Sequence, residues 1–208
     1  MSIDTPSRSE RSGVRAERQA ETRRRLVDMA REMFLADGYA ATSLDKVSER
    51  AGFSKGAVYS NFSGKEELCM AVLDSIHAEQ VVKVSDVFSG PGDLEERIER
   101  FVEWAREGIG QPAWVALESE FGAVARQSPF VASALRRRQR EVRDAIIALI
   151  EQVTREQGIA LRFTSEEAAT MLLSFGIGLG ALRSFDPGID PKLFGDVLRT
   201  LLRGSRAT

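Results

Sequence analysis

A cation, an aromatic hydroxyl and two short hydrogen-bonding side chains lie close together in residues 55 to 61. The residues predicted to face outward there are Lys55, Gly56, Ala57, Tyr59, Ser60 and Asn61. Such polar groups bond to phosphates and base edges, and residues without bulk let a nucleic acid approach closely. The stretch therefore predicts a reading surface, with Lys55 on a guanine edge and Asn61 or Ser60 on an adenine edge or water.

Two short helices are expected to position this surface. An apolar face recurs at helical spacing through Leu44, Val47, Ser48 and Ala51. Gly52 then ends that helix, and Ser54 is placed to cap the next one. Apolar contacts between the two would come from Phe53, Val58 and Phe62. Two short helices joined by a tight glycine-containing turn form a helix-turn-helix, whose second helix enters the DNA major groove.

Polar residues at two further helix starts are candidates for the DNA backbone. Thr42 with Asp45, and Ser63 with Glu66, each fit a capping box. Lys65 would lie in a first helical turn, where a cation conflicts with the helix dipole unless a phosphate docks there. The predicted backbone contacts are Thr42, Ser43, Tyr59 and Lys65, and Ser54 completes the DNA-binding set.

A longer helix is predicted to brace this pair from the N-terminal side, over residues 16 to 37. Its buried face would carry Leu26, Ala30, Met33 and Phe34, with Gly38 as a left-handed cap. Residues 1 to 16 are polar and arginine-containing, and a disordered basic arm is expected, either reaching DNA or serving as a solubilising tail. The arginines at 23 to 25 either touch phosphate or form a solvated face.

The run from residue 22 to residue 68 resembles the DNA-binding domain of the TetR family of transcriptional regulators. The matching residues include Leu26, Ala30, Phe34, Gly38-Tyr39, Thr42-Ser43, Ala51-Gly52-Phe53-Ser54, Gly56, Val58-Tyr59, Asn61-Phe62 and Lys65-Glu66-Glu67-Leu68. The resemblance implies a DNA-binding domain over residues 17 to 68 and a helical ligand-binding and dimerisation domain over 69 to 208. It also implies a dimer on a near-palindromic double-stranded operator, and it does not identify the ligand.

Composition narrows the alternatives. The 208 residues are 43% hydrophobic and 29% charged, and helix-forming Ala, Leu, Arg and Glu dominate, which predicts an all-α fold. Residues 1 to 65 hold 12 Lys and Arg against 9 Asp and Glu, whereas the whole chain has a net charge of −2. Attraction for polyanions is therefore expected at the N-terminal end.

Several classes of chemistry lack their motifs. The sequence contains no P-loop, GxSxG, HExxH or paired metal-ligand spacing, so no cofactor, no metal and no enzymatic activity are expected. Cys69 is the only cysteine, and His77, eight residues later, is too distant for a local dyad. No signal peptide is evident, and the most apolar stretch, 171 to 182, is shorter than a membrane span. These features predict a cytoplasmic protein without a membrane partner.

The C-terminal part reads as helices separated by strong breakers. Helix 4 is expected to run from the DNA domain to about residue 88, followed by helices over 93 to 108, about 112 to 125, 129 to 157, 165 to 185 and 191 to 203. The last two, about 165 to 203, resemble the pair with which TetR-family subunits dimerise. Gly176, Gly178 and Gly180 fit a close helix crossing, either between subunits or within the monomer.

Aromatic residues on different C-terminal helices are candidates to line a ligand cavity. The set is Phe101, Trp104, Trp114, Leu117, Glu118, Phe121 and Phe175. The alternative for the apolar members is a simple core. Glu118 needs a partner if buried, either an internal arginine or a cationic ligand.

These observations predict a ligand-responsive transcriptional regulator, a dimeric repressor that a small molecule releases from its operator. The alternatives are a constitutive or architectural DNA-binding regulator without a ligand and, more remotely, a helical enzyme. The operator sequence, the regulated genes, the effector, the choice between repressor and activator, and the number of dimers per operator are beyond what the sequence determines.

Overall fold

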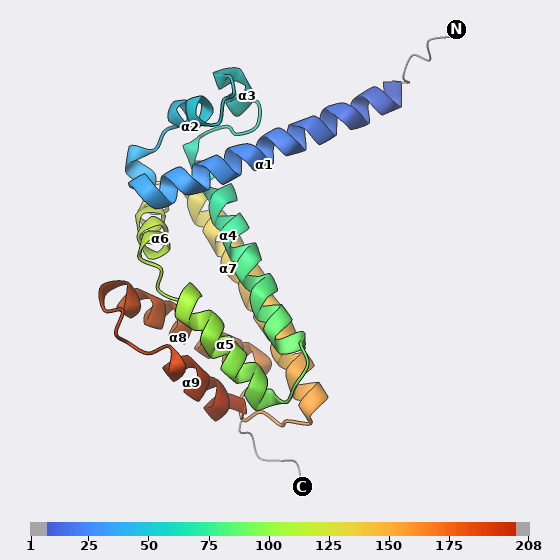
Figure 1. Cartoon of the computed structure of the whole chain (residues 1–208), viewed down its shortest axis with the longest axis vertical. Coiled ribbons are helices and arrows are strands. Elements are labelled where there is room, and N and C mark those ends of the chain that lie inside the picture. Colours follow the sequence, from blue (N-terminus) through green and yellow to red (C-terminus); the bar gives the residue numbers. More distant parts are fainter. Residues whose placement is uncertain (1–7, 203–208) are drawn as a thin grey trace. The chain divides into compact units, whose positions relative to one another are not determined.

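The computed structural model describes residues 8 to 202, which form nine α-helices and no strand (Figure 1). The predicted all-α class is therefore confirmed. The helices are α1 (Arg8–Ala41), α2 (Leu44–Arg50), α3 (Lys55–Tyr59), α4 (Lys65–Ser89), α5 (Leu94–Gly108), α6 (Pro112–Val124), α7 (Pro129–Gln157), α8 (Ser165–Phe185) and α9 (Lys192–Leu202).

The chain divides into two compact units, Met1–Leu73 and Asp74–Thr208. The division falls inside α4, five residues after the domain boundary predicted at 68. Helix α4 runs without interruption from the first unit into the second. The first unit contains the predicted reading helices, and the second contains the helices predicted to bind a ligand and to dimerise.

Helix α1 begins earlier than predicted. It starts at Arg8 instead of residue 16, so residues 8 to 16 are helical in place of the expected disordered arm, and residues 1 to 7 lie outside the described part of the chain. Gly38, with φ 82° and ψ 169°, interrupts the helix near its end.

Both predicted N-terminal capping boxes are wrong in their residues. Ser43, not Thr42, caps α2 by accepting a hydrogen bond from the backbone N–H of Lys46. Thr42 is buried and its hydroxyl instead donates to the carbonyl of Gly38 at 3.0 Å. At the start of α4, the backbone N–H and the hydroxyl of Ser63 both donate to Glu67 Oε2 at 2.9 Å. Because α4 begins at Lys65, Glu67 rather than Glu66 is its third residue and reaches back to Ser63.

The first unit has a compact core in which α1 supports the two short helices. The core side chains are Leu26, Ala30, Phe34, Val47, Val58, Phe62 and Leu68, each at most 1% exposed. Tyr39, the residue after Gly38, folds back so that its ring stacks on Phe34 at a centroid distance of 5.8 Å. This packing fixes α3 through a single fully buried side chain, Val58.

In the second unit, the expected helix starts for α7 and α8 are confirmed. Ser128 caps α7, whose first residue is Pro129, and Gly158 ends it in the left-handed region. Thr164 and Glu167 form a capping box at α8, and Asp93 and Glu96 form another at α5. These caps satisfy backbone N–H groups that would otherwise lack partners.

A core built from α4, α5, α7, α8 and α9 holds the second unit together. The Phe101 ring lies 4.9 Å from that of Phe194, and Phe175 lies 5.3 Å from Phe194, both edge-on. Gly195 lets α9 approach α5, because a Cβ there would lie 2.6 Å from Val102 Cγ2. The rings of α5 and α8 therefore meet on α9.

Helix α8 is apolar by composition, and much of it is exposed within this chain. Over its 21 residues it is long and apolar enough to cross a membrane, by length and composition alone, so the apolar stretch is longer than residues 171 to 182 suggested. Core helices of globular proteins pass the same test, and one such helix is weak evidence. Only 22% of the apolar 18-residue stretch within α8 is buried in this chain.

Candidate DNA interface and effector region

Helix α3 presents the predicted reading residues on its outer side. Ser54 caps it by accepting from the backbone N–H of Ala57 at 3.2 Å. Tyr59 is 57% exposed, although large aromatic side chains are usually covered. Gly56 has only the Ser54 hydroxyl oxygen near the position of a Cβ, at 3.9 Å. The surface is therefore exposed and low in bulk, as the sequence predicted, and its base contacts stay predictions.

Lys55 already has an anionic partner. Its Nζ lies 2.5 Å from Asp45 Oδ2 of α2, and both side chains are at least half exposed. The hydrogen bond that Lys55 donates to Asp45 is the main reason that the pKa of Lys55 lies above its ordinary value. A contact between Lys55 and a guanine edge would therefore require the ammonium to exchange Asp45 for the base.

Asn61 is used to close the end of α3. Its Nδ2 donates to the carbonyl of Ala57 at 2.8 Å, which satisfies one of the last carbonyls of the helix. Its own carbonyl accepts from Arg23 Nη1. The predicted adenine contact would require this side chain to turn away from α3, whereas Ser60, which is exposed, lies beside it.

Lys65 and Thr42, both predicted to contact the DNA backbone, bond instead to residues near the end of α1. Lys65 Nζ lies 3.3 Å from the carbonyl of Ala40 and 4.1 Å from the centroid of the Tyr39 ring. Burial is the largest reason that the pKa of Tyr39 is raised to about 12. Since the Thr42 side chain is buried and bonded to Gly38, a phosphate at this end of α2 would meet Ser43 and backbone N–H groups first.

Arg23 has a role that sequence reasoning missed. Its guanidinium lies 4.1 Å from the centroid of the Phe62 ring, donates to the Asn61 carbonyl and lies 3.5 Å from Glu67 Oε1. The hydrogen bond from the Ser63 backbone is the largest reason that the pKa of Glu67 is lowered. Arg23 therefore ties α1 to the turn between α3 and α4.

Arg25 and Arg24 differ from Arg23 in their contacts. Arg25 lies over the Phe53 ring at 4.8 Å, so it too packs on the helix-turn-helix. Arg24 is 74% exposed and pairs with Glu21 of its own helix. The three arginines therefore do not act as one set: Arg23 and Arg25 pack on aromatic rings, and Arg24 faces solvent. Because they are consecutive residues of the same type in one helix, the sequence did not distinguish them.

The predicted cavity residues do not gather around one space. Phe101 is buried with Phe194, Trp104 packs 5.1 Å from Phe101, and Phe175 joins the same cluster. Leu117 and Phe121 are at most 1% exposed. Most of these residues are therefore core in the arrangement described, which was the alternative that the sequence left open.

Trp114 and Glu118 lie apart from that cluster, with His77 of α4. Glu118 Oε1 is 2.7 Å from His77 Nε2, and the Trp114 ring is edge-on to His77 at 5.4 Å. The His77 side chain is only 23% exposed. The partner of Glu118 within the chain is thus a histidine, not the arginine that the sequence suggested. Because His77 and Glu118 are 41 residues apart in the chain, no local spacing in the sequence could have predicted their contact.

A charged surface groove lies between α5 and α9, with a volume of about 710 Å³. Its lining residues are Pro91, Gly92, Glu96, Glu99, Arg100, Val102, Glu103, Arg106, Lys192 and Arg199. The seven residues predicted to bind a ligand do not line it. Arg199 is held there by ion pairs to Glu95 and Asp196, which raise the pKa of Arg199 further.

Sequence comparison with known families matches both units. Residues 26–72 match the family of bacterial regulatory proteins called tetR, and residues 94–205, more than half of the chain, match the BetI-type transcriptional repressor C-terminal domain. The chain belongs to the TetR family. It is therefore a DNA-binding transcriptional regulator, and its family is one of regulators, not of enzymes.

The relatives of this TetR-family chain align with it over different lengths of sequence. SrpR of Pseudomonas putida is 47% identical over 55 residues, which are 26% of each chain. TtgR, also of Pseudomonas putida, is 41% identical over 61 residues, 29% of each chain. These alignments therefore span less than a third of those relatives. UidR of Escherichia coli strain K12 is 22% identical over 183 residues, 88% of this chain and 92% of UidR.

Solved structures share the fold of this family member. The reduced form of Escherichia coli NemR has a TM-score of 0.68 at 20% identity, over 90% of this chain and 100% of NemR. A TetR-family regulator from Mesorhizobium loti has a TM-score of 0.70 at 19% identity, over 89% of this chain and 95% of that one. At these identities the likeness concerns the fold alone.

Proposed function

We propose that this chain is a dimeric repressor that a small-molecule effector releases from a palindromic operator. The carrying observation is that one continuous helix, α4, joins the helix-turn-helix unit to a second helical unit that matches a repressor C-terminal domain. An effector that binds the form with misplaced reading helices more tightly shifts the population away from DNA. Convincing release requires a preference of about 1 to 3 kcal/mol or more per coupled site.

The DNA contacts of this proposal come from α2, α3 and the start of α4. Exposed Tyr59 and the capped start of α2 at Ser43 need no rearrangement to meet DNA, whereas the exposed Ser60 hydroxyl already donates to the carbonyl of Ala57. Lys55, Asn61 and Lys65 must exchange an intramolecular partner for the nucleic acid. Two reading helices about 34 Å apart would serve successive major grooves.

The dimer contact is assigned to α8 with α9. From residue 174 onward, the exposed residues of α8 recur at helical spacing and are small or apolar: Ser174, Ile177, Gly178, Ala181, Leu182 and Phe185. Ile177, Leu182 and Phe185 are 64%, 59% and 89% exposed. Exposed apolar stripes of this kind mark association surfaces. A second subunit packed on this stripe would also explain why α8 is apolar by composition but little buried within one chain.

The sequence left open whether the three glycines of α8 serve a crossing between subunits or packing within the monomer, and the structure separates them. A Cβ at Gly176 would lie 3.1 Å from the Phe194 ring, which is a tight contact, so Gly176 serves packing within the chain. One at Gly180 would lie at an ordinary contact distance, 3.7 Å from Gly110 N, so Gly180 is covered within the chain but packing there does not require glycine. Gly178 faces open space in the single chain. We therefore assign only Gly178 to a close crossing of α8 with its counterpart in a second subunit.

A constitutive regulator without an effector is the second candidate. The observation that favours it is the burial of Phe101, Leu117 and Phe121, which are 5%, 1% and 0% exposed and so are core residues in the described arrangement. Under the first proposal, the effector separates α6 from α4 near Trp114 and Glu118. A cytoplasmic location fits both candidates, because each acts on chromosomal DNA.

The experiment that separates the two candidates measures binding of the purified protein to its own upstream intergenic DNA at two salt concentrations, with and without a compound panel. The repressor proposal expects specific binding that at least one compound abolishes. Specific binding that survives a broad panel of apolar, anionic and cationic compounds would favour the constitutive regulator.

A further inference from the structure

The N-terminal half of α1 carries arginines along one face. Arg15 and Arg18 are three residues apart, and Arg25 follows ten residues after Arg15, so the three lie within a strip about 80° wide. All three residues are exposed. In the sequence the same spacing continues to Arg11 and Arg8. The helical extension of α1 therefore presents cations in a row, called here the arginine face.

The arginine face lies on the side of α1 that faces the core of the first unit farther along the helix. Eighteen residues make about five full turns of an α-helix, and Arg15 precedes Met33 by that number. Met33 is buried, whereas Arg15 is exposed, because α1 continues as one rod beyond α2 and α3 (Figure 1). The side that α1 uses to pack on the unit is therefore open to solvent at Arg15.

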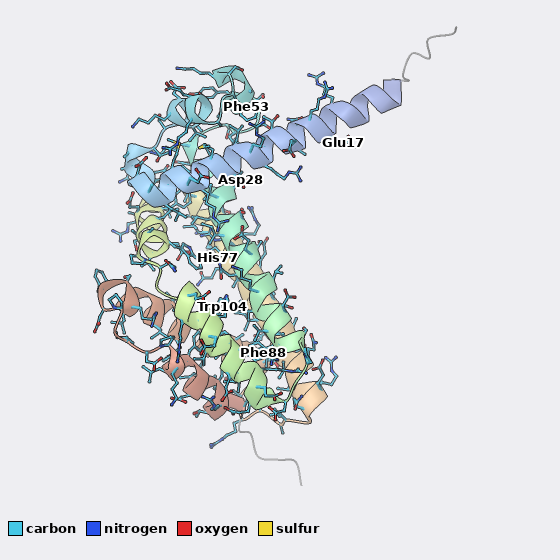
Figure 2. The ribbon with its side chains drawn as sticks, in the orientation of Figure 1. Glu17, Asp28, Phe53, His77, Phe88 and Trp104 are labelled. Carbon is cyan, nitrogen blue, oxygen red and sulfur yellow. The ribbon has the colours of Figure 1, made fainter. Side chains whose placement is uncertain are left out.

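Acidic residues of the same helix are turned away from that side. Glu17, Glu21 and Asp28 fall within about 40° of one another around α1, and all three are exposed (Glu17 and Asp28 are labelled in Figure 2). They lie at least about 120° around the helix from Arg15 and Met33. A polyanion that approaches from the core side of α1 therefore meets guanidinium groups before carboxylates.

Arg25 connects the arginine face to the candidate DNA interface. Its guanidinium lies 4.8 Å from the centroid of the Phe53 ring, and Phe53 directly precedes Ser54, the cap of α3 (Figure 2). Arg18 and Arg15 lie about 10 and 15 Å farther along the helix axis. Each strand of a duplex carries a phosphate about every 3.4 Å along its axis, so DNA bound at α3 has phosphates over a comparable length.

A membrane surface fits the arginine face less well than DNA does. A helix that lies on a membrane buries an apolar face in the lipid. Between residues 8 and 21 the apolar side chains are those of Val14, Ala16 and Ala20, and their spacing forms no continuous apolar face.

We infer that Arg15 and Arg18 on the arginine face of α1 form a second DNA-binding surface, which holds phosphates of double-stranded DNA outside the helix-turn-helix. This inference deepens the DNA-binding part of the proposed function and depends on neither an effector nor repression. Contacts to phosphate raise the affinity for every sequence and carry no base preference.

The test measures how DNA binding by the full chain depends on salt. Arg15→Gln and Arg18→Gln, singly and together, each remove one charge and keep a helix-forming residue. Arg24→Gln is the matched control, because Arg24 is 74% exposed and lies nine residues from Arg15, on the opposite side of the same helix. Arg15→Lys keeps the charge. Anisotropy is measured with upstream intergenic DNA and with an unrelated duplex of equal length.

Each loss of Arg15 or Arg18 is expected to reduce the slope of log K against log salt by about 0.9 with both duplexes. The affinity deficit of each single variant should therefore shrink about three- to fourfold between about 50 and 200 mM salt. Preference for upstream over unrelated DNA should stay within about twofold, since no base contact is removed. Arg24→Gln and Arg15→Lys should keep the slope of the unchanged chain.

An unchanged slope in the double variant with both duplexes would overturn the inference and leave an acidic protein as the partner of the arginine face. Weaker binding to upstream DNA alone, without a change of slope, would also overturn it. Reduced slopes in a chain that shows no preference for upstream DNA would support the inference and count against the proposed operator at that place. If the chain binds neither duplex, both fall.

Discussion

Arg23 shows how a single side chain decides the geometry of the reading helix. It joins a cation–aromatic contact to Phe62, a hydrogen bond to the Asn61 carbonyl and an ion pair to Glu67. Because its side chain is 41% exposed, solvent screens the ion pair, and the fixed planar geometry of the guanidinium matters more than its charge. We therefore regard Arg23 as a positioning residue for α3, not a phosphate contact.

Replacing Arg23 with Gln is expected to weaken specific operator binding by about three- to tenfold, since α3 loses its tie to α1. The salt dependence of binding should keep its slope, because no phosphate contact is removed. Fluorescence anisotropy at several salt concentrations measures both quantities. Arg24→Gln, with the same change of charge on an exposed residue, is the control. A slope reduced by about one in Arg23→Gln alone would instead assign that residue to phosphate.

Glu67 gives the same turn a pH dependence. Its pKa is lowered below 4.5, chiefly by the hydrogen bond from the Ser63 backbone. The ionised form is therefore favoured by folding, so this stabilisation is present above pH 4.5 and is lost as the pH falls through the lowered value. In urea unfolding, the unchanged chain should exceed Glu67→Gln in stability at pH 7, and the difference should shrink below about pH 4.5. A difference independent of pH would contradict this assignment.

At the scale of elements, α8 is the helix whose composition one chain does not explain. Its exposed stripe is apolar, and Gly178 lies on it with open space around the position of a Cβ. Gly122 of α6 has the same open surroundings, but its neighbours at helical spacing, Glu118 and Ser119, are polar. The two glycines therefore form a matched pair for testing where a second subunit lies.

Gly178→Leu is expected to raise the dimer dissociation constant by more than about tenfold, because the side chain separates the two α8 helices. Helicity of the single chain should not fall, since Leu is a better helix former than Gly and a Cβ there meets no atom within 4 Å. Analytical ultracentrifugation with circular dichroism measures both effects. Gly122→Leu should leave association unchanged, and equal loss in both variants would place the interface elsewhere.

At the scale of the whole molecule, operator binding should depend on two chains acting together. If Gly178→Leu is monomeric, its affinity for the full operator should fall by at least about a hundredfold, and the slope of log K against log salt should be roughly halved. Anisotropy titrations on the full operator and on one half-site measure this. Equal affinity of the variant and the unchanged chain for the full operator would show that each chain binds alone.

The local patterns of the sequence were enough for the all-α class, the helix-turn-helix and the starts of α7 and α8. Val58, Ser54 and the Ser128-Pro129 pair act through neighbours within a few residues, so their spacing carries the information. The same reasoning erred by one residue at Thr42 and at Glu66, because α2 and α4 begin one residue later than these spacings imply, at Leu44 and Lys65.

Only the tertiary structure decided which distant groups meet. Arg23 with Glu67, His77 with Glu118 and Asp74 with Arg138 are separated by 44, 41 and 64 residues, and the helical spacing around each one is ordinary. The same holds for the glycines of α8, which look alike in sequence although Gly176 is covered by Phe194 and Gly178 is open. Side-chain periodicity reports which face of a helix is apolar, whereas the partner of that face is determined by the packing of the whole chain.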